Sequence, residues 1–365
     1  MMEKVDIAII GAGIVGLAIA YELSRQTNKT VVVLEKNTSF GLETSSRNSQ
    51  VIHSGIYYPA AMLKTQLCIE GRERLYDFCN NFRVDYKKLG KLIVASDADD
   101  LPGLQNIMQQ GSANQVESWL LSTHQINQLE PFMRASEALY LPESGIVDVH
   151  QLMQKLYTFS RYNNVIFFFR SELIGLEYNG HEYILETNRD KFKAEWVINS
   201  AGLSSDTIPS LLGLNIDDYN YRIYPCKGEY YSLNKPFPIK HLIYPLPGKS
   251  GLLGIHITPD MTGRLRLGPN SYDISTINYN MDNCNQESFY LSVRKFLPDL
   301  KPEDIAPDFA GVRPRLQNLS QPLNDFVINE ENLKGFPQLV NLIGIESPGL
   351  TSCLAIANYV KNLII

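Results

Sequence analysis

The chain has 365 residues, of which 44% are hydrophobic, and its formal net charge at pH 7 is −6. This length suffices for about two domains with a large buried core. An acidic balance without any basic block argues against nucleic acid as a main partner. The cysteines form no Cys-x-x-Cys pair, and no histidine–cysteine cluster has the spacing of metal ligands. We therefore expect neither a disulfide framework nor a bound metal.

Cellular location follows from the same features. An odd number of cysteines without a pairing pattern favours a reducing, cytoplasmic compartment. No uninterrupted apolar run reaches the roughly 18 residues of a membrane-spanning helix. We expect a cytoplasmic protein, and peripheral docking on the inner face of a membrane stays open.

The N-terminus has the most informative pattern. Residues 5–10 are apolar and rich in β-branched side chains, which predicts a strand buried on both faces. They lead directly into a Gly-x-Gly-x-x-Gly turn at residues 11–16. Residues 14–25 then have helical apolar spacing, and residues 30–34 predict a second strand that ends at Glu35. Strand, turn, helix, strand and acid in this order predict a dinucleotide site.

Each part of this motif has a physical role. Gly11 permits the tight turn, Gly13 lets the backbone approach a pyrophosphate, and Gly16 lets helix and strand pack closely. The phosphates would meet unpaired amides at the positive end of the helix dipole. Glu35 would accept hydrogen bonds from a ribose 2′-hydroxyl, although an ordinary solvated acid is the alternative. The motif alone does not distinguish NAD from FAD.

A second polar segment makes that distinction. Residues 43–58 contain a run of hydroxyls, an amide and one arginine, followed by His53 and two tyrosines. Here the chain resembles the D-amino-acid-oxidase-like superfamily of FAD enzymes, and within it the L-2-hydroxyglutarate dehydrogenase/oxidase family. The resemblance extends over nearly the whole chain, through residues 224–231, 241–245, 254–256, 268–270, 311–314, 325–328 and 341–351.

The resemblance implies an α/β fold with FAD as the cofactor. We expect a discontinuous Rossmann-like FAD-binding domain of residues 1–85, 140–215 and 326–365. A mainly antiparallel β-sheet substrate domain would take residues 86–139 and 216–325. Within these, residues 173–178 and 183–187 predict a hairpin, residues 97–128 predict helices with a polar connection, and residues 350–363 predict a final helix.

Apart from Leu173 of the predicted hairpin, the expected FAD contacts come from four places along the chain. The first is the motif and its acid, the second is the hydroxyl run, and the third is the Ala-Gly pair after the strand at residues 196–199. The fourth is the Gly/Pro turn that opens the final helix, whose dipole would face the flavin edge that becomes negative on reduction. The predicted residues are Gly11, Ala12, Gly13, Ile14, Gly16, Glu35, Lys36, Thr44, Ser45, Arg47, Asn48, Ser49, Leu173, Ala201, Gly202, Pro348, Gly349, Leu350 and Thr351.

Oxidation of a 2-hydroxy acid needs a base and cations for carboxylates. His53 is the first candidate base because imidazole has a suitable pKa; a structural histidine and a covalent flavin attachment point are the alternatives. His256 is the second candidate base. The resemblance implies that Arg313 is a carboxylate clamp, for which a guanidinium is suited. Lys227 would bind a carboxylate or tune the flavin.

Three further residues, Tyr58, Tyr244 and Arg315, are weaker candidates for substrate binding. The leading hypothesis is oxidation of L-2-hydroxyglutarate to 2-oxoglutarate by hydride transfer to flavin N5, with electrons passed to a quinone, another acceptor or oxygen. An amine or amino-acid oxidase, or a glycerol-3-phosphate dehydrogenase, on the same fold is the alternative. A flavin-binding protein without turnover is a third hypothesis.

Overall fold

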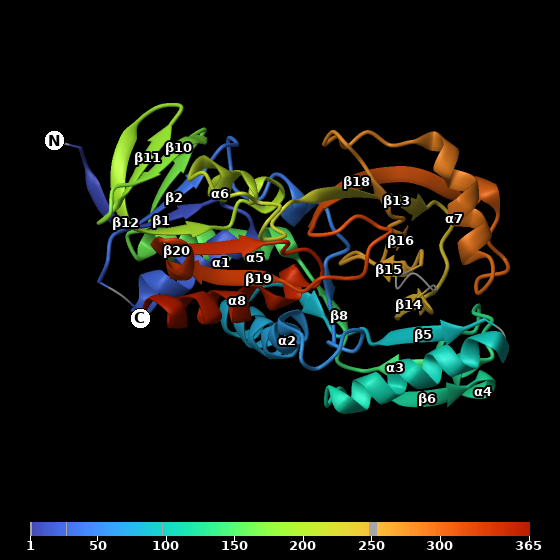
Figure 1. The fold of residues 1–365 in the computed structure, drawn as a ribbon. Coiled ribbons are helices and arrows are strands. Elements are labelled where there is room, and N and C mark those ends of the chain that lie inside the picture. Colours follow the sequence, from blue (N-terminus) through green and yellow to red (C-terminus); the bar gives the residue numbers. More distant parts are fainter. Residues whose placement is uncertain (1, 27, 97, 248–253) are drawn as a thin grey trace.

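A computed structural model describes residues 2–26, 28–96, 98–247 and 254–365. Its strands form two large sheets and one small sheet, and Figure 1 shows the two large sheets side by side along the molecule. The small sheet lies between them and consists of β3 (Val51–Ile52), β8 (Gly145–Val147) and β4 (Tyr86–Lys87).

The first large sheet has a parallel core that begins at the N-terminus. Its parallel strands, from one side to the other, are β9 (Ile166–Phe169), β2 (Val31–Glu35), β1 (Lys4–Ile10), β12 (Lys191–Asn199) and β20 (Phe336–Ile343). An antiparallel strand, β19 (Val327–Glu331), pairs with β20. The carboxyl ends of β1, β2 and β12 therefore meet at one edge, where ligands bind in open α/β sheets.

Helices cover one face of this sheet. They are α1 (Ile14–Gln26), α2 (Leu63–Phe82), α5 (Val149–Tyr162) and α8 (Gly349–Ile364), and their buried side chains pack with Ile7 and Ile9 of β1. Asp325 stabilises the start of α2, because its carboxylate accepts from the amides of Leu63 (2.5 Å) and Lys64 (2.9 Å).

An antiparallel layer covers the opposite face. The hairpin of β10 (Leu173–Tyr178) and β11 (Tyr183–Thr187) continues into the first half of β12, and α6 (Thr207–Leu211) packs beside it. Alternate residues of β1, Ala8 and Ile10, face this layer, which explains why β1 is apolar on both faces.

The second large sheet is mainly antiparallel; among its described pairings, β5 with β14 is parallel. Its strands are β5 (Lys91–Ala95), β6 (Trp119–Ser122), β7 (Glu137–Leu141), β13 (Tyr224–Leu233), β14 (Leu242–Pro245), β15 (Ile257–Pro259), β16 (Leu265–Leu267), β17 (Tyr272–Asp273) and β18 (Ile305–Arg315). The helices beside it are α3 (Leu101–Ala113), α4 (Thr123–Leu129) and α7 (Gln286–Val293).

These elements confirm most of the sequence-based secondary structure. The first strand, the glycine turn, the hairpin and the final helix lie within a residue or two of their predicted positions. One expectation was wrong: the polar connection between the helices of residues 97–128 contains the strand β6. This strand has four residues at a sheet edge and exposes Trp119 and Leu120, so it has no alternating pattern to reveal it. The residue boundaries of the two domains stay a prediction.

The structure also generates a stability prediction. Buried Asn341 accepts from Asn199 Nδ2 (2.8 Å) and donates to Glu331 Oε1 (2.9 Å), which joins β12, β20 and β19. Asn341→Ala leaves both partners without this bond, so we expect it to lower the free energy of unfolding by about 1–3 kcal/mol. Denaturant unfolding would measure this, and exposed Asn332→Ala is the control. Equal stability of the two variants would contradict the prediction.

Candidate active site

Two adjoining pockets lie along the carboxyl edge of the first large sheet. We call the first, at the carboxyl ends of β1, β2 and β12, the turn pocket, and the second, which contains His53 and His256, the histidine pocket. The two pockets share five of their lining residues, so they form one continuous cavity. The shared residues are Gly13, Thr44, Ser45, Ser200 and Gly202.

The glycine turn closes tightly against the end of β12. Gly11 has a φ of +98°, and a Cβ there would lie 2.7 Å from the carbonyl oxygen of Ser200. A Cβ on Gly16 would lie 2.0 Å from the carbonyl oxygen of Gly11. No side chain fits at either position, so the turn brings its backbone to the cavity wall, where Gly11 and Gly13 line the turn pocket.

Glu35 lies at the end of β2 and also lines the turn pocket. One carboxylate oxygen accepts from the amide of Ala12 (2.8 Å), and the other accepts from the amide (2.8 Å) and side chain (2.9 Å) of Asn37. Glu35 therefore fixes the turn as well as facing the pocket. Lys36 lines the same pocket and forms an ion pair with Glu43 at 3.0 Å. Leu173, Ala201 and Gly202 complete this wall.

The hydroxyl run lines the histidine pocket with Thr44, Ser45, Arg47, Asn48 and Ser49. Ser45 Oγ accepts from the amide of Ile14 at the start of α1 (2.9 Å), and Thr44 donates to the carbonyl of Val312 (2.8 Å). Arg47 Nε is buried without a hydrogen-bond partner among the described residues. The run thus joins the two sheets and leaves a donor for a ligand.

The C-terminal segment lies on the opposite wall. Pro348, Gly349 and Leu350 line the histidine pocket, whereas Thr351 is fully buried behind it. Thr351 Oγ1 accepts from the amide of His53 (3.0 Å). The structure therefore does not bring the Thr351 side chain to the cavity; it ties α8 to the backbone of His53. Ala12 and Gly16 likewise do not line either pocket, and they act through the shape of the turn.

Both candidate bases face the histidine pocket. His53 Nε2 lies 3.5 Å from Ser347 Oγ, and its Nδ1 lies 3.5 Å from the Nζ of Lys91. Burial, together with the charges of Lys91, His256 and Arg313, holds the pKa of His53 well below its usual value. His53 is thus a neutral imidazole at neutral pH, as a base must be.

His256 has a more constrained ring. Its Nδ1 lies 2.8 Å from the carbonyl oxygen of Gly254 and must donate to it, and the ring stacks on Tyr244 with centroids 3.8 Å apart. Burial lowers the pKa of His256 to about 3, even though the bond to Gly254 acts in the opposite direction. His256 is therefore rigid and neutral, with only Nε2 free to accept a proton.

Two arginines come from one face of β18. Arg313 and Arg315 are two residues apart and both line the histidine pocket. Arg313 donates to Ser271 Oγ (3.3 Å), and no ion pair between described residues involves it. Arg315 is buried and its Nε lies 3.6 Å from Glu346 Oε1, while its Nη1 has no hydrogen-bond partner among the described residues. The pocket thus offers guanidinium donors to an anion.

Tyr58 and Tyr244 also line this pocket, as predicted from the sequence. Burial raises the pKa of both phenols, with a further contribution from Glu346 at Tyr58 and from Tyr230 at Tyr244. Both side chains therefore remain neutral hydroxyls that can donate a hydrogen bond.

The expected role of Lys227 is not supported. Side chains alternate along a strand, and Gly228 and Tyr230 of β13 line the pocket, so Lys227 points to the other face. Its Nζ donates to Asn278 Oδ1 (2.7 Å) and to the carbonyl of Asn280. A basic residue close to His53 is Lys91, whose position the sequence did not reveal because a lysine at the start of a strand resembles a solvated end.

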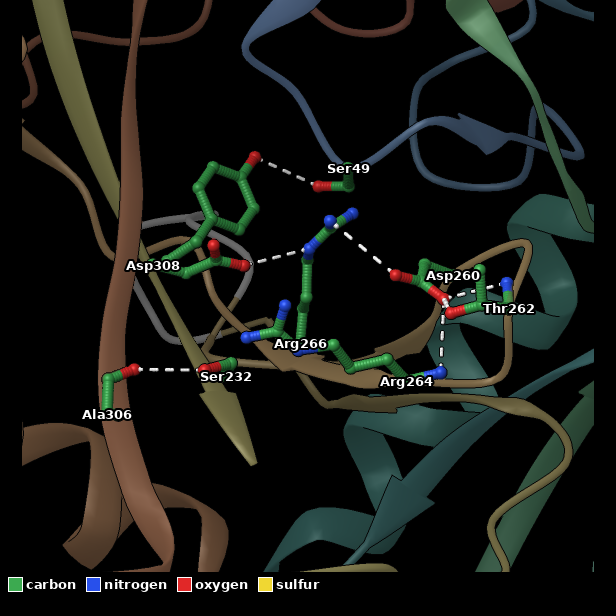
Figure 2. A network of polar contacts seen from close by, with 9 residues as sticks. Ser49, Ser232, Asp260, Thr262, Arg264, Arg266, Ala306 and Asp308 are labelled. Atoms are coloured by element: carbon green, nitrogen blue, oxygen red, sulfur yellow. Dashed lines mark hydrogen bonds and ion pairs between the residues drawn. The ribbon is translucent and has the colours of Figure 1, made fainter. Parts of the chain in front are cut away.

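Tyr230 is a second residue that the sequence did not reveal. Its hydroxyl lies 3.0 Å from Ser49 Oγ, and its ring stacks on Phe309 at 4.4 Å. Beside Phe309, Arg266 is held by Asp308 (3.0 Å) and Asp260 (3.6 Å), and Figure 2 shows Arg266 between these two acids. This network supports the pocket wall and links it to the hydroxyl run.

The described residues can also be compared with the requirements of metal sites and membrane-spanning helices. Among the described residues, no group of three or more histidines, cysteines or acids could hold a metal ion. In the same part of the chain, the helices are too short or too polar to cross a membrane. Four thiols are buried and Cys284 is exposed.

Comparison with known proteins identifies the family. The model of the FAD dependent oxidoreductase family matches residues 6–363. L-2-hydroxyglutarate dehydrogenase from Arabidopsis thaliana is 37% identical, covering 99% of this chain and 83% of the relative. A glycerol 3-phosphate dehydrogenase from Caloramator mitchellensis is 32% identical, covering 98% and 73%. The chain belongs to the FAD-dependent oxidoreductase family, which confirms the resemblance, the α/β fold class and FAD as the cofactor.

A solved structure agrees with this assignment. L-α-glycerophosphate oxidase from Mycoplasma pneumoniae, with FAD bound, has a TM-score of 0.88 and 25% identity, covering all of this chain and 95% of that one. The residues of the cavity fit the cofactor: the glycine turn leaves space only for backbone, and the buried Nε of Arg47 lacks a partner among the described residues.

The turn generates a prediction on cofactor binding. In Gly16→Ala the new methyl would collide with the carbonyl of Gly11 and with Ser200 Oγ (2.7 Å), so the turn must open. We expect purified Gly16→Ala to contain little FAD, measured by its visible absorbance. Gly103→Ala in α3 is the matched control, because its Cβ would make an ordinary 3.4 Å contact. A fully loaded Gly16→Ala protein would show that the turn is not needed.

Proposed function

We propose that this enzyme oxidises L-2-hydroxyglutarate to 2-oxoglutarate. The observation that carries this proposal is the histidine pocket, in which a neutral histidine and two arginines share one cavity with the cofactor-binding turn. The substrate is a dicarboxylate with a hydroxyl group on the reacting carbon, so it needs both a base and cations. The relatives named L-2-hydroxyglutarate dehydrogenase, at 37% and 31% identity, support the same substrate.

The residues of the turn pocket would hold the ADP half of FAD. Gly11, Gly13 and Ile14 would present backbone to the diphosphate, with Ser45 beside them, and Glu35 would face the ribose. Lys36, Leu173, Ala201 and Gly202 would enclose the adenosine.

The histidine pocket would hold the flavin ring. The hydroxyl run with Arg47 and the segment Pro348–Leu350 would contact the ring from opposite walls, and the start of α8 would favour negative charge there. FAD supplies the hydride acceptor in this chemistry.

Arg313 and Arg315 would bind the substrate carboxylates. Arg313 is the freer of the two, since Glu346 already neutralises part of the charge of Arg315. A guanidinium binds a carboxylate through two parallel hydrogen bonds, which fixes the orientation of the substrate as well as its position. The neutral hydroxyls of Tyr58 and Tyr244 would donate to substrate oxygens from the same pocket.

His53 would remove the hydroxyl proton as hydride leaves the substrate carbon. Its Nε2 points toward Ser347, which also lines the pocket, and its low pKa keeps it unprotonated. His256 is the less suitable base, because its ring is stacked on Tyr244 and bonded to Gly254. In this arrangement His256 would instead shape the pocket wall.

A glycerol-3-phosphate dehydrogenase activity is the second candidate. It is supported by the relative of that name at 32% identity and by the likeness to the glycerophosphate oxidase structure. A phosphate could occupy the arginines in place of a carboxylate. With either substrate, the electrons would pass to a quinone, another acceptor or oxygen. The cytoplasmic location stays a prediction, and peripheral membrane docking stays open.

Anaerobic reduction of the bound flavin tests the substrate. We expect L-2-hydroxyglutarate to bleach the flavin band at roughly 450 nm, and the D-enantiomer, L-lactate, glycine and glycerol-3-phosphate to bleach it far more slowly. L-lactate lacks the second carboxylate and therefore reports its contribution. Faster bleaching by glycerol-3-phosphate would establish the second candidate, and no bleaching by any 2-hydroxy acid would discard the proposal.

A variant of the proposed base tests the mechanism. His53→Gln keeps a polar side chain but cannot take a proton, so we expect the rate constant of flavin reduction to fall by about 10²–10⁴. Stopped-flow absorbance measures it, with exposed His181→Gln as the control. A rate constant within about twofold of the unmodified enzyme would assign the base to another residue.

A further inference from the structure

Lys91 is a fully buried lysine directly behind His53. Its Nζ lies 3.5 Å from His53 Nδ1, 4.0 Å from the centroid of the Tyr244 ring and 5.4 Å from that of Tyr57. No ion pair between described residues involves Lys91, although Arg72, Lys64 and other buried cations have acids nearby. An ammonium removed from water without a carboxylate is costly, so such a site favours the neutral amine.

The titration of Lys91 agrees with this geometry. Burial lowers the pKa of Lys91 to about 7, and the nearby Cys68 thiol acts in the opposite direction. A lysine of this kind exchanges a proton near neutral pH, which an ordinary surface lysine does not. If Lys91 only filled space, Met or Leu would serve there without the free-energy cost of burying an amine.

The state of Lys91 decides which nitrogen of His53 is protonated. His53 can act as a base only if Nε2, on the pocket side, is bare, so the neutral ring must carry its proton on Nδ1. Nδ1–H needs an acceptor, and a neutral amine accepts whereas an ammonium only donates. A neutral Lys91 therefore stabilises the active tautomer, and a charged Lys91 stabilises the inactive one.

We propose that Lys91 is a positioning residue that sets the tautomer of His53 and receives its Nδ1 proton during the reaction. This inference rests on the proposed function, in which His53 is the base. The substrate O–H bond breaks and an Nε2–H bond forms; the Nδ1–H bond breaks and an Nζ–H bond forms. The positive charge ends on Lys91, and the electron pair of the C–H bond leaves as hydride to the flavin.

The surroundings explain why the positive charge moves from His53 to Lys91. Burial and the fixed positive charge of Arg313 both disfavour an imidazolium at His53. Around Lys91 lie the faces of the Tyr244 and Tyr57 rings and the Cys68 thiol. Aromatic faces attract a cation, so the ammonium is better placed on Lys91 than on His53.

The main alternative is that Lys91 serves as a permanent cation. Two substitutions separate the possibilities. Lys91→Arg keeps the charge but has no neutral form, so it would hold the inactive tautomer at every pH tested. Lys91→Met removes the amine and retains much of the volume. A permanent-cation role predicts that Arg restores function, whereas a proton acceptor predicts that it does not.

The first readout is the rate constant of anaerobic flavin reduction by L-2-hydroxyglutarate against pH. In the unmodified enzyme we expect this rate constant to fall as the pH drops through about 7, because Lys91 becomes charged. In Lys91→Met this fall at low pH should disappear, and above pH 7 the rate constant should be about 10-fold or more below that of the unmodified enzyme. In Lys91→Arg the rate constant should be low at every pH. Substrate binding, measured by saturation of the same rate, should change little.

The matched control is Lys64→Met. Lys64 is also buried, but its ammonium lies over the rings of Tyr58 and Phe326, each at 5.1 Å, rather than beside a histidine. In Lys64→Met the rate constant of flavin reduction should still fall as the pH drops through about 7, whatever its absolute value. The proposal would be overturned if the rate constant of Lys91→Met still fell below about pH 7, or if Lys91→Arg were as fast as the unmodified enzyme.

The second readout needs no substrate. NMR of isotope-labelled histidine ring nitrogens in the FAD-loaded protein, with His53→Gln to assign the signal, reports the tautomer directly. Above pH 7 we expect Nδ1–H in the unmodified protein and Nε2–H in Lys91→Arg. Finding Nε2–H in both would refute the inference. Absence of flavin reduction by any 2-hydroxy acid would instead refute the proposed function, so the two failures are distinguishable.

Discussion

The close approach of the glycine turn to the end of β12 is the constraint on which the cofactor site depends. The Cβ position of Gly16 lies 2.0 Å from the carbonyl oxygen of Gly11, and that of Gly11 lies 2.7 Å from the Ser200 carbonyl oxygen, so only backbone fits there. β1 is flanked by β2 and β12, and all three run parallel. Their carboxyl ends therefore bring the turn, Glu35 and Ser200 to one edge, which is where dinucleotides bind in such sheets.

The histidine pocket depends on a different principle, the burial of charge. Buried Arg315 and partly buried Arg313 both line this pocket, and Glu346 lies beside Arg315 and balances only part of their charge. Low polarity and neighbouring cations both disfavour a protonated imidazole. The same groups that attract an anionic substrate thus keep His53 neutral, so substrate binding and general-base catalysis arise from one arrangement of charges.

The sequence predicted what depends on local pattern. Turn, hairpin and final helix have short-range signals, and the family motifs point to many of the residues that line the cavity, although Ala12, Gly16 and Thr351 do not line it. It did not predict Lys91 or Tyr230, because their roles come from contacts between segments distant in the chain. Lys227 lies outside the pocket for a simple reason: it is next to Gly228 in the sequence, but alternate side chains of a strand point to opposite faces.

Side chains of the histidine pocket lie on elements that hold them firmly. Arg313 and Arg315 belong to β18, which pairs with β13 along most of its length, and Tyr244 belongs to β14, whose partner β5 begins at Lys91. His53 follows the short strand β3, but its amide is bonded to Thr351 in the first turn of α8. Because α8 begins beside Pro348, any shift of the segment that lines the cavity also moves His53. The base and the cofactor wall are therefore positioned together, as a transfer that depends on close alignment of the reacting atoms requires.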